Sequence, residues 1–104
     1  MLNWLPLTTE QEFHNLYEQE SPFAVFKHST RCSISSMAKN RIEKEWNLDI
    51  PIYYLDLIEY RSVSNDIATT SGIHHESPQL IVFKDKTVAY HASHNFIFVN
   101  DIVI

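Results

Sequence analysis

The sequence contains one cysteine and one glycine among its 104 residues. A single cysteine cannot form an internal disulfide, which excludes a disulfide-stapled scaffold and fits a reducing compartment. No stretch approaches the roughly 20 apolar residues of a membrane span, and the N-terminus lacks the basic start and apolar run of a signal peptide. We therefore expect a cytoplasmic protein without a membrane segment, whose sulfur chemistry involves a second molecule.

Basic residues are also scarce, eight against thirteen acidic ones, and the net charge is -5. A general nucleic-acid binder needs clustered Lys and Arg to neutralise phosphates, so we expect no nucleic-acid partner. Five of the eight nevertheless fall within eighteen residues around Cys32, namely Lys27, Arg31, Lys39, Arg41 and Lys44. This cluster fits either a solvated basic helix face or a positive field that favours a thiolate and an anionic partner.

Helical and strand patterns alternate along a chain whose length suits one domain, residues 1–104. A capping box, Thr9 with Glu12, predicts a helix from about Thr9 to Glu20. Apolar spacing, β-branched residues and turn residues predict the later elements. These are a buried strand at 22–27, a helix of roughly fourteen residues with an apolar stripe of Ile34, Met37, Ala38, Ile42 and Trp46, a strand at 51–56, a helix at 61–71 capped by Gly72, and a hairpin at 79–92 turning at 84–86.

The order of these elements predicts an α/β fold with a mixed four-stranded sheet flanked by helices. Strands separated by helices are expected to pair in parallel, and the two hairpin strands must be antiparallel. The terminal segment 95–104 remains open, because topology calls for a covering helix whereas its Ile and Val residues favour a strand. If exposed, such a segment would support a weak dimer, so we expect a monomer or a weak dimer.

Cys32 is predicted to lie in the first turn of a helix that directly follows a buried strand. Free N–H groups, the helix dipole, Arg31 and Lys27 would then favour a thiolate, and the polar neighbours argue against burial. Ser35 lies one helical turn further on and is expected to donate a hydrogen bond to the thiolate. His28 ends the strand, and it would either tune the thiolate or have a structural role. A C-x-x-S site has no resolving cysteine, so an adduct on Cys32 must wait for an outside thiol.

Four segments of the sequence together resemble one known family. They are FKHSTRCSIS, YYLDLIEYRSVSN, HHESPQLIVF and Ser93-His94, which span Trp4 to His94. In order and approximate spacing they resemble the monothiol bacilliredoxins, also called bacillithiol-system general stress proteins. That resemblance implies a thioredoxin-like fold.

The resemblance also implies an activity, the removal of bacillithiol from protein mixed disulfides in Firmicute bacteria. Cys32 would be the nucleophile that takes bacillithiol from a client protein, and bacillithiol or another reducing thiol would regenerate it. Bacillithiol is then a co-substrate, and no bound cofactor is expected. Its malyl carboxylates would suit the basic residues near Cys32.

Ser77-Pro78 is the second site that the resemblance implies. In thioredoxin-like proteins the proline before the third core strand is cis and faces the cysteine, and the residue before it bonds the backbone of the disulfide partner. Pro78 would thus shape the site and Ser77 would contact substrate. The alternative is a trans proline that merely starts a strand.

Three other classes of function share some features with this sequence. Six histidines suggest a metal, but their spacing matches no zinc site, so no metal ligands are expected. A monothiol glutaredoxin-like iron–sulfur cluster carrier also has C-x-x-S, but it carries loop glycines and a glycine pair that this chain lacks. A non-catalytic thioredoxin-fold interaction module would have an inert Cys32.

Overall fold

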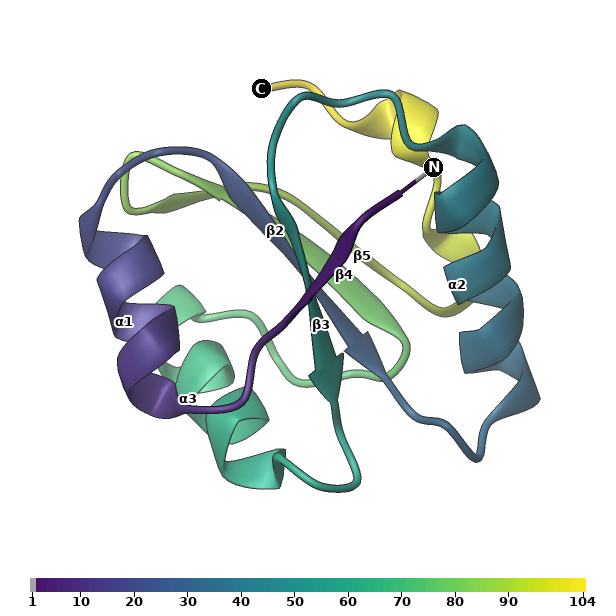
Figure 1. Cartoon of the computed structure of the whole chain (residues 1–104), viewed down its shortest axis with the longest axis horizontal. Coiled ribbons are helices and arrows are strands. Elements are labelled where there is room, and N and C mark those ends of the chain that lie inside the picture. Colours follow the sequence, from purple (N-terminus) through teal and green to yellow (C-terminus); the bar gives the residue numbers. More distant parts are fainter. Residues whose placement is uncertain (1) are drawn as a thin grey trace.

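The chain forms a five-stranded sheet between two layers of helices and turns in the computed structural model, which describes residues 2–104 (Figure 1). The strands are β1 (Trp4–Pro6), β2 (Phe23–His28), β3 (Ile52–Asp56), β4 (Gln79–Lys84) and β5 (Thr87–Ser93). The helices are α1 (Glu10–Glu18), α2 (Ser33–Glu45) and α3 (Arg61–Ser71), followed by the 3-10 turns η1 (His94–Phe96) and η2 (Val99–Asp101). Within residues 2–104, no helix combines the length and apolar character needed to cross a membrane.

The strand order is β1-β3-β2-β4-β5, which confirms an α/β fold with a mixed sheet but corrects the number of strands from four to five. The missed strand, β1, has three residues and pairs in parallel with β3 at the sheet edge. Three residues are too few to show strand alternation in a sequence. Pro6 has no backbone N–H to donate, and proline of this kind is tolerated in an edge strand.

The strand directions differ from the prediction at one position. β2 and β3 are parallel, whereas β4 is antiparallel to β2 although a helix precedes it. The reason is that α3 does not complete a crossover. Helix α3 leads away from the C-terminal end of β3, and the irregular segment 72–78 returns to that same end of the sheet. There Gln79, the first residue of β4, pairs with Lys27.

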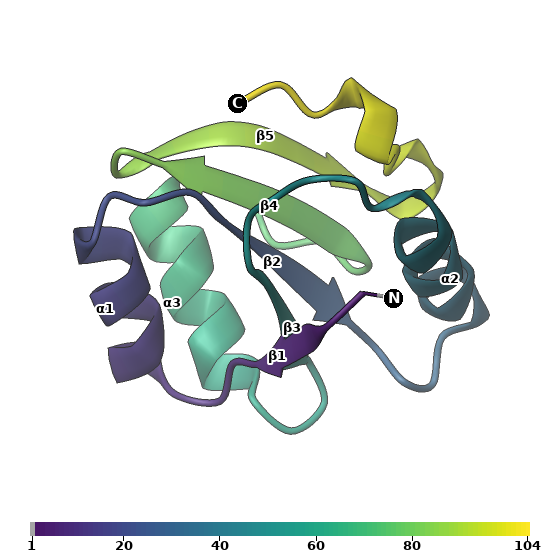
Figure 2. The same ribbon diagram turned by 45° about the horizontal axis from the view of Figure 1, so that its top comes forward.

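The two faces of the sheet carry separate apolar cores. Helices α1 and α3 cover one face, and α2 with the C-terminal turns covers the other (Figure 2). β2 is buried along its whole length, with Phe23 and Val25 in the first core and Ala24 and Phe26 in the second. The alternation of strand side chains therefore sends the last two residues of β2 to opposite faces.

Helix α2 has a narrower buried stripe than predicted. Ala38 and Ile42 are buried, but Ile34 and Met37 are 41% and 59% exposed. The buried face is centred on Ser35, Ala38 and Ile42, so the two exposed residues lie at its margin.

The predicted caps and turns after β3 are confirmed. Gly72 caps α3 in the left-handed region with φ 74°, where a side chain would be disfavoured. The hairpin between β4 and β5 turns through Asp85 and Lys86, which both have positive φ, 53° and 60°. Positive φ at both central residues matches the twist of the flanking strands, even though neither is glycine.

The C-terminal segment forms neither the covering helix nor the strand that the sequence left open. Its two 3-10 turns instead bury Ile97, Val99 and Ile102 against the α2 side of the sheet. The Arg41 guanidinium on α2 donates to the carbonyl of Ile97 over 3.1 Å. Covering of this face is thus achieved by short turns, which suit β-branched residues better than a helix does.

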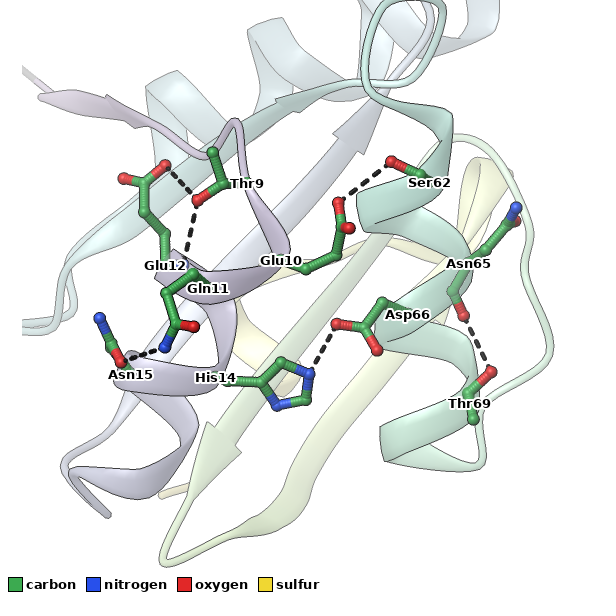
Figure 3. Close-up of polar contacts among 10 residues, drawn as sticks. All are labelled: Thr9, Glu10, Gln11, Glu12, His14, Asn15, Ser62, Asn65, Asp66 and Thr69. Carbon is green, nitrogen blue, oxygen red and sulfur yellow. Dashed lines mark hydrogen bonds and ion pairs between the residues drawn. The ribbon is translucent and has the colours of Figure 1, made fainter.

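Polar contacts join α1 to α3 on the outer surface of these two helices (Figure 3). The Ser62 hydroxyl donates to the Glu10 carboxylate over 3.0 Å, and the His14 and Asp66 side chains approach to 2.7 Å. Beneath them, Phe13 and Ile67 belong to the same buried core. The apolar contacts set the packing of the two helices, and the exposed polar pairs add little to stability.

The N-cap of α1 gives a first testable prediction. The Thr9 hydroxyl accepts a hydrogen bond from the Glu12 N–H over 3.1 Å (Figure 3). Thr9→Ala removes this acceptor, and we expect the free energy of unfolding to fall by about 1 kcal/mol. Urea denaturation measures the change. Thr69→Ala within α3 is the control and should cost nothing, because alanine has the higher helix propensity; equal losses in the two variants would contradict the capping role.

Candidate functional site

Cys32 is the N-cap of α2 and lies in the loop that follows the central strand β2. Its backbone N–H donates to the carbonyl of Ser29 over 3.2 Å, and its carbonyl accepts from the N–H of Ser36 over 3.1 Å. The residue is a free cysteine of intermediate exposure. The N-terminus of a helix presents N–H groups without intrahelical partners and the positive end of the helix dipole, and Cys32 lies at this end of α2.

Ser35 is completely buried, and its hydroxyl is engaged away from Cys32. Its Oγ accepts a hydrogen bond from the Ser29 N–H over 3.0 Å and lies 2.6 Å from His28 Nδ1. No hydrogen bond joins Ser35 to Cys32 in the described part of the chain. The expected donation to the thiolate is therefore absent from this geometry, because both contacts of the hydroxyl go to the end of β2 and the loop after it.

His28 lies on the α2 face of the sheet, buried between two aromatic rings. Its ring centroid is 5.6 Å from that of Phe26 and 5.3 Å from that of Tyr54. Burial lowers the pKa of His28, the nearby Lys39 ammonium lowers it further, and Asp56 acts in the opposite direction. The imidazole accepts at Nδ1 in the tautomer that carries its proton on Nε2, and in that tautomer the Ser35 hydroxyl is the donor. In the structure His28 is a buried side chain that contacts Ser35 and the two aromatic rings.

Lys27 lies on the other face of the sheet and makes no contact with Cys32. Its side chain is fully buried, with Nζ donating to the Ser64 carbonyl over 3.3 Å and lying 3.5 Å from His75 Nδ1. Burial, with a smaller contribution from the Arg61 charge, lowers the pKa of Lys27 from 10.5 to about 8. Lys27 is close to Cys32 in the sequence, but its charge lies on the other face of the sheet, because successive strand residues point to opposite faces.

The remaining basic residues near Cys32 are separated by the fold. The Lys39 ammonium pairs with Glu43 at 2.8 Å and lies over the Trp4 ring, on the β1 side of α2. Arg41 contacts the C-terminal segment through the Ile97 carbonyl and the Phe98 ring. Arg31 is exposed and precedes Cys32 in the chain. The contacts of Lys27, Lys39 and Arg41 thus direct these three residues to different parts of the fold and not to one shared site.

The Ser77-Pro78 peptide bond is cis, as the resemblance implied. Pro78 immediately precedes β4. Because Gln79 pairs with Lys27, Pro78 lies at the end of the sheet where β2 finishes and the Cys32 loop begins. In the described residues, Ser77 forms no backbone–backbone hydrogen bond, and its buried hydroxyl has no partner. Ser77 therefore offers free backbone groups at the edge that carries the thiol.

Sequence reasoning missed a clamp that holds the Pro78 segment to the end of β5. The Ser93 hydroxyl donates to the Glu76 carboxylate over 2.7 Å, and this bond is the main cause of the lowered pKa of Glu76. The His94 N–H donates to the Pro78 carbonyl over 2.9 Å. In the sequence, Ser93-His94 is one of the segments that resemble the bacilliredoxin family. No spacing pattern indicates that Ser93 contacts Glu76.

The six histidines do not assemble a metal site. Within residues 2–104, no three side chains among His, Cys, Asp and Glu are placed to hold a metal ion together. His14 pairs with Asp66 on α3, His28 with Ser35, and His75 with Ser64, so those three serve packing and polar contacts within the protein.

The arrangement at this edge defines a class of protein. A mixed sheet carries one thiol at the N-terminus of the helix after its central strand, and a cis-proline lies at the same edge. This is a thioredoxin fold with a single cysteine at that position. The model of the monothiol bacilliredoxin BrxC family matches residues 5–102, and the chain belongs to that family. The family and the fold give the chain a thiol redox role.

Solved structures support the fold. A thioredoxin-fold protein with a provisionally assigned oxidoreductase activity is 30% identical to the chain, with a TM-score of 0.83, and the alignment covers 92% of this chain and 87% of that one. Thioredoxin from Malassezia sympodialis is 11% identical with a TM-score of 0.75, covering 97% and 85%. Mitochondrial thioredoxin 3 from Saccharomyces cerevisiae is 19% identical with a TM-score of 0.67, covering 88% and 83%. The two thioredoxins are similar in fold alone.

Proposed function

We propose that the protein is a monothiol thiol-disulfide oxidoreductase that removes bacillithiol from protein mixed disulfides. The observation that carries the proposal is the placement of Cys32, a free and partly exposed thiol at the N-cap of α2 in a member of the monothiol bacilliredoxin family. No other cysteine is present in the chain. Any disulfide formed at this site must therefore join Cys32 to another molecule.

The proposed reaction has two thiol–disulfide exchanges. In the first, the Cys32 thiolate attacks the bacillithiol sulfur of the mixed disulfide, the client sulfur leaves as a thiolate, and the adduct is then on Cys32. In the second, the thiolate of free bacillithiol or another reducing thiol attacks the bacillithiol sulfur of this adduct and releases Cys32. One disulfide is consumed and one formed in each step, so no further oxidant or reductant is needed.

Ser77 and Pro78 are proposed to receive the client next to the thiol. Ser77 lies two residues before β4, and its backbone groups are free to bond an extended segment of the client in the manner of an added strand. Arg31 is the proposed contact for the carboxylates of bacillithiol, because it is exposed and adjacent to Cys32.

The test is intact-mass spectrometry of the reduced protein mixed with a bacillithiolated model protein. We expect the mass of one bacillithiol to move from the model protein to this chain, and free bacillithiol to remove it again. Protein whose thiol has been blocked beforehand with iodoacetamide serves as the control and should accept nothing. No transfer to a chain whose Cys32 is still readily alkylated would reject the proposal.

Ser35→Cys gives a further prediction for the same reaction. The introduced thiolate lies one helical turn from Cys32, so it can attack Cys32 Sγ, form an intramolecular disulfide and expel bacillithiol. We expect the bacillithiol adduct on Cys32, which accumulates in the wild type, to be replaced by a product two mass units lighter than the reduced chain. An adduct as persistent as that of the wild type would show that the two positions cannot react.

A further inference from the structure

Ser35, His28 and Ser29 form a hydrogen-bonded group, here called the Ser35 node, which joins the end of β2 to the first turn of α2. Ser29 N–H donates to Ser35 Oγ over 3.0 Å, and Ser35 Oγ lies 2.6 Å from His28 Nδ1. Two of the three members of the node are closed from water, Ser35 being fully buried and His28 only 4% exposed, while Ser29 is half-buried. The hydroxyl oxygen accepts from Ser29, and its one proton is donated to His28 Nδ1 in the imidazole tautomer protonated at Nε2.

Backbone hydrogen bonds of the same loop connect the Ser35 node to Cys32. Ser29 is held through its N–H by Ser35, and its carbonyl accepts from the N–H of Cys32. The carbonyl of Cys32 in turn accepts from the N–H of Ser36, the residue after Ser35. Cys32 therefore lies inside a closed ring of hydrogen bonds that begins and ends at residues 35 and 36.

We infer that Ser35 is a positioning residue, whose hydroxyl holds Cys32 at the N-cap of α2 through Ser29. This inference deepens the proposed function and rests on Cys32 being its reactive thiol. The serine of C-x-x-S, Ser35, therefore has a role of its own and does not merely replace a resolving cysteine. Its hydroxyl keeps the reactive sulfur at the N-terminus of α2.

The neighbouring serines provide a contrast within the same helix. Ser33 and Ser36 are exposed, and neither side chain forms a hydrogen bond with another described residue. Only the serine that faces the sheet reaches both His28 and Ser29. Ser36→Ala is therefore a matched control for Ser35→Ala, with the same atom removed from the same helix.

Hydrogen exchange of the wild-type protein tests the node without any substitution. The amides of Ser29 and Cys32 have partners, whereas those of Thr30 and Arg31 have no backbone partner in the described chain. We expect the first pair to exchange at least about tenfold more slowly than the second pair. Equal exchange at Ser29 and Thr30 would overturn the inference, and this result does not depend on any variant folding.

The functional test is the rate at which iodoacetamide alkylates Cys32 at neutral pH under native conditions. We expect Ser35→Ala to slow alkylation by about tenfold, because the loop is no longer held, and to remove the protection of the Ser29 amide. The His28 side-chain 15N shifts should lose the pattern of an Nδ1 that accepts a hydrogen bond. Ser36→Ala should match the wild type in all three measurements. A wild-type alkylation rate in folded Ser35→Ala would overturn the inference.

His28→Phe separates the node from a general effect on stability. A phenylalanine ring can keep the stacking with Phe26 and Tyr54 but cannot accept from Ser35. We expect alkylation to slow severalfold, and the double variant with Ser35→Ala to be no slower than Ser35→Ala alone, since both changes break one unit. Independent, multiplying effects would overturn the inference.

The alkylation result is independent of bacillithiol. If the wild type transfers no bacillithiol but Ser35→Ala still slows alkylation, the proposed function fails and the positioning role stands. If transfer occurs and alkylation of Ser35→Ala is unchanged, the proposed function stands and the positioning role fails.

Discussion

Cys32→Ala is expected to abolish bacillithiol transfer, reducing it to the background of the uncatalysed reaction. The chain has no second sulfhydryl that can accept an adduct, so the loss should be complete and not partial. The fold should survive, because the Cys32 side chain makes no capping hydrogen bond and the residue is held through its backbone. We expect the free energy of unfolding to change by less than about 1 kcal/mol.

Two measurements together check this prediction. Intact-mass spectrometry follows the adduct, and urea denaturation shows that the variant is folded. Cys32→Ser, which keeps a polar atom of similar size, should be equally inactive, because a serine hydroxyl is not deprotonated at neutral pH. Transfer retained by either folded variant would place the acceptor elsewhere and reject the mechanism.

The absence of a resolving cysteine has a consequence for the order of events. In a C-x-x-C site the second thiol competes with outside thiols for the mixed disulfide, whereas in the proposed reaction the adduct on Cys32 would persist until another molecule arrives. The free backbone groups of Ser77 would be available to a client in the first exchange. The second exchange involves a small thiol and does not need them.

Elements with local signals were predictable from the sequence. The residues of α3 and its glycine cap agree with the prediction, because apolar spacing and a left-handed C-cap are both encoded within a dozen residues. β1 was missed because it has no pattern of its own and exists only by pairing with β3. The direction of β4 was missed because it depends on the path of the irregular segment 72–78.

The candidate site was predictable in its position and less so in its contacts. The helix start after a buried strand placed Cys32 correctly, and the resemblance placed the cis-proline. The partners of Ser35 and Lys27 were not predictable, because they depend on which face of the sheet or helix each side chain occupies. Lys27 and His28 are adjacent in β2 and point to opposite faces, so His28 contacts Ser35 on α2 and Lys27 contacts Ser64 on α3.

Lys27 is the least expected feature of the interior, a fully buried amine without a counter-ion. In the described chain, no carboxylate lies within ion-pair distance of it. The groups around it are the Ser64 carbonyl, His75 and the positive charge of Arg61, and the pKa of His75 is itself lowered, first by burial and then by Lys27. A charge in this setting destabilises the folded state, since burial removes its hydration.

Stability should therefore depend on pH through Lys27. The folded-state pKa of Lys27 is about 8 and the unfolded value is 10.5. Between these values the unfolded chain binds more protons at this residue, so its contribution to the free energy of unfolding rises with pH. A shift of this size corresponds to about 3 kcal/mol, which is recovered as pH rises from about 8 to 10.5 and is missing at every pH below 8.

Lys27→Met is expected to raise the free energy of unfolding at pH 7 by about 2 kcal/mol, because methionine fills the same space without a charge to desolvate. The difference between variant and wild type should change by about 3 kcal/mol in favour of the wild type as pH rises to 10.5, since the wild-type amine becomes neutral, so the advantage disappears and the variant becomes the less stable protein. Urea denaturation at 25 °C across this range measures both effects. Lys84→Met, at an exposed lysine that ends β4, is the control and should follow the wild-type profile. A pH profile of Lys27→Met parallel to that of the wild type would mean that the buried amine is not the titrating group.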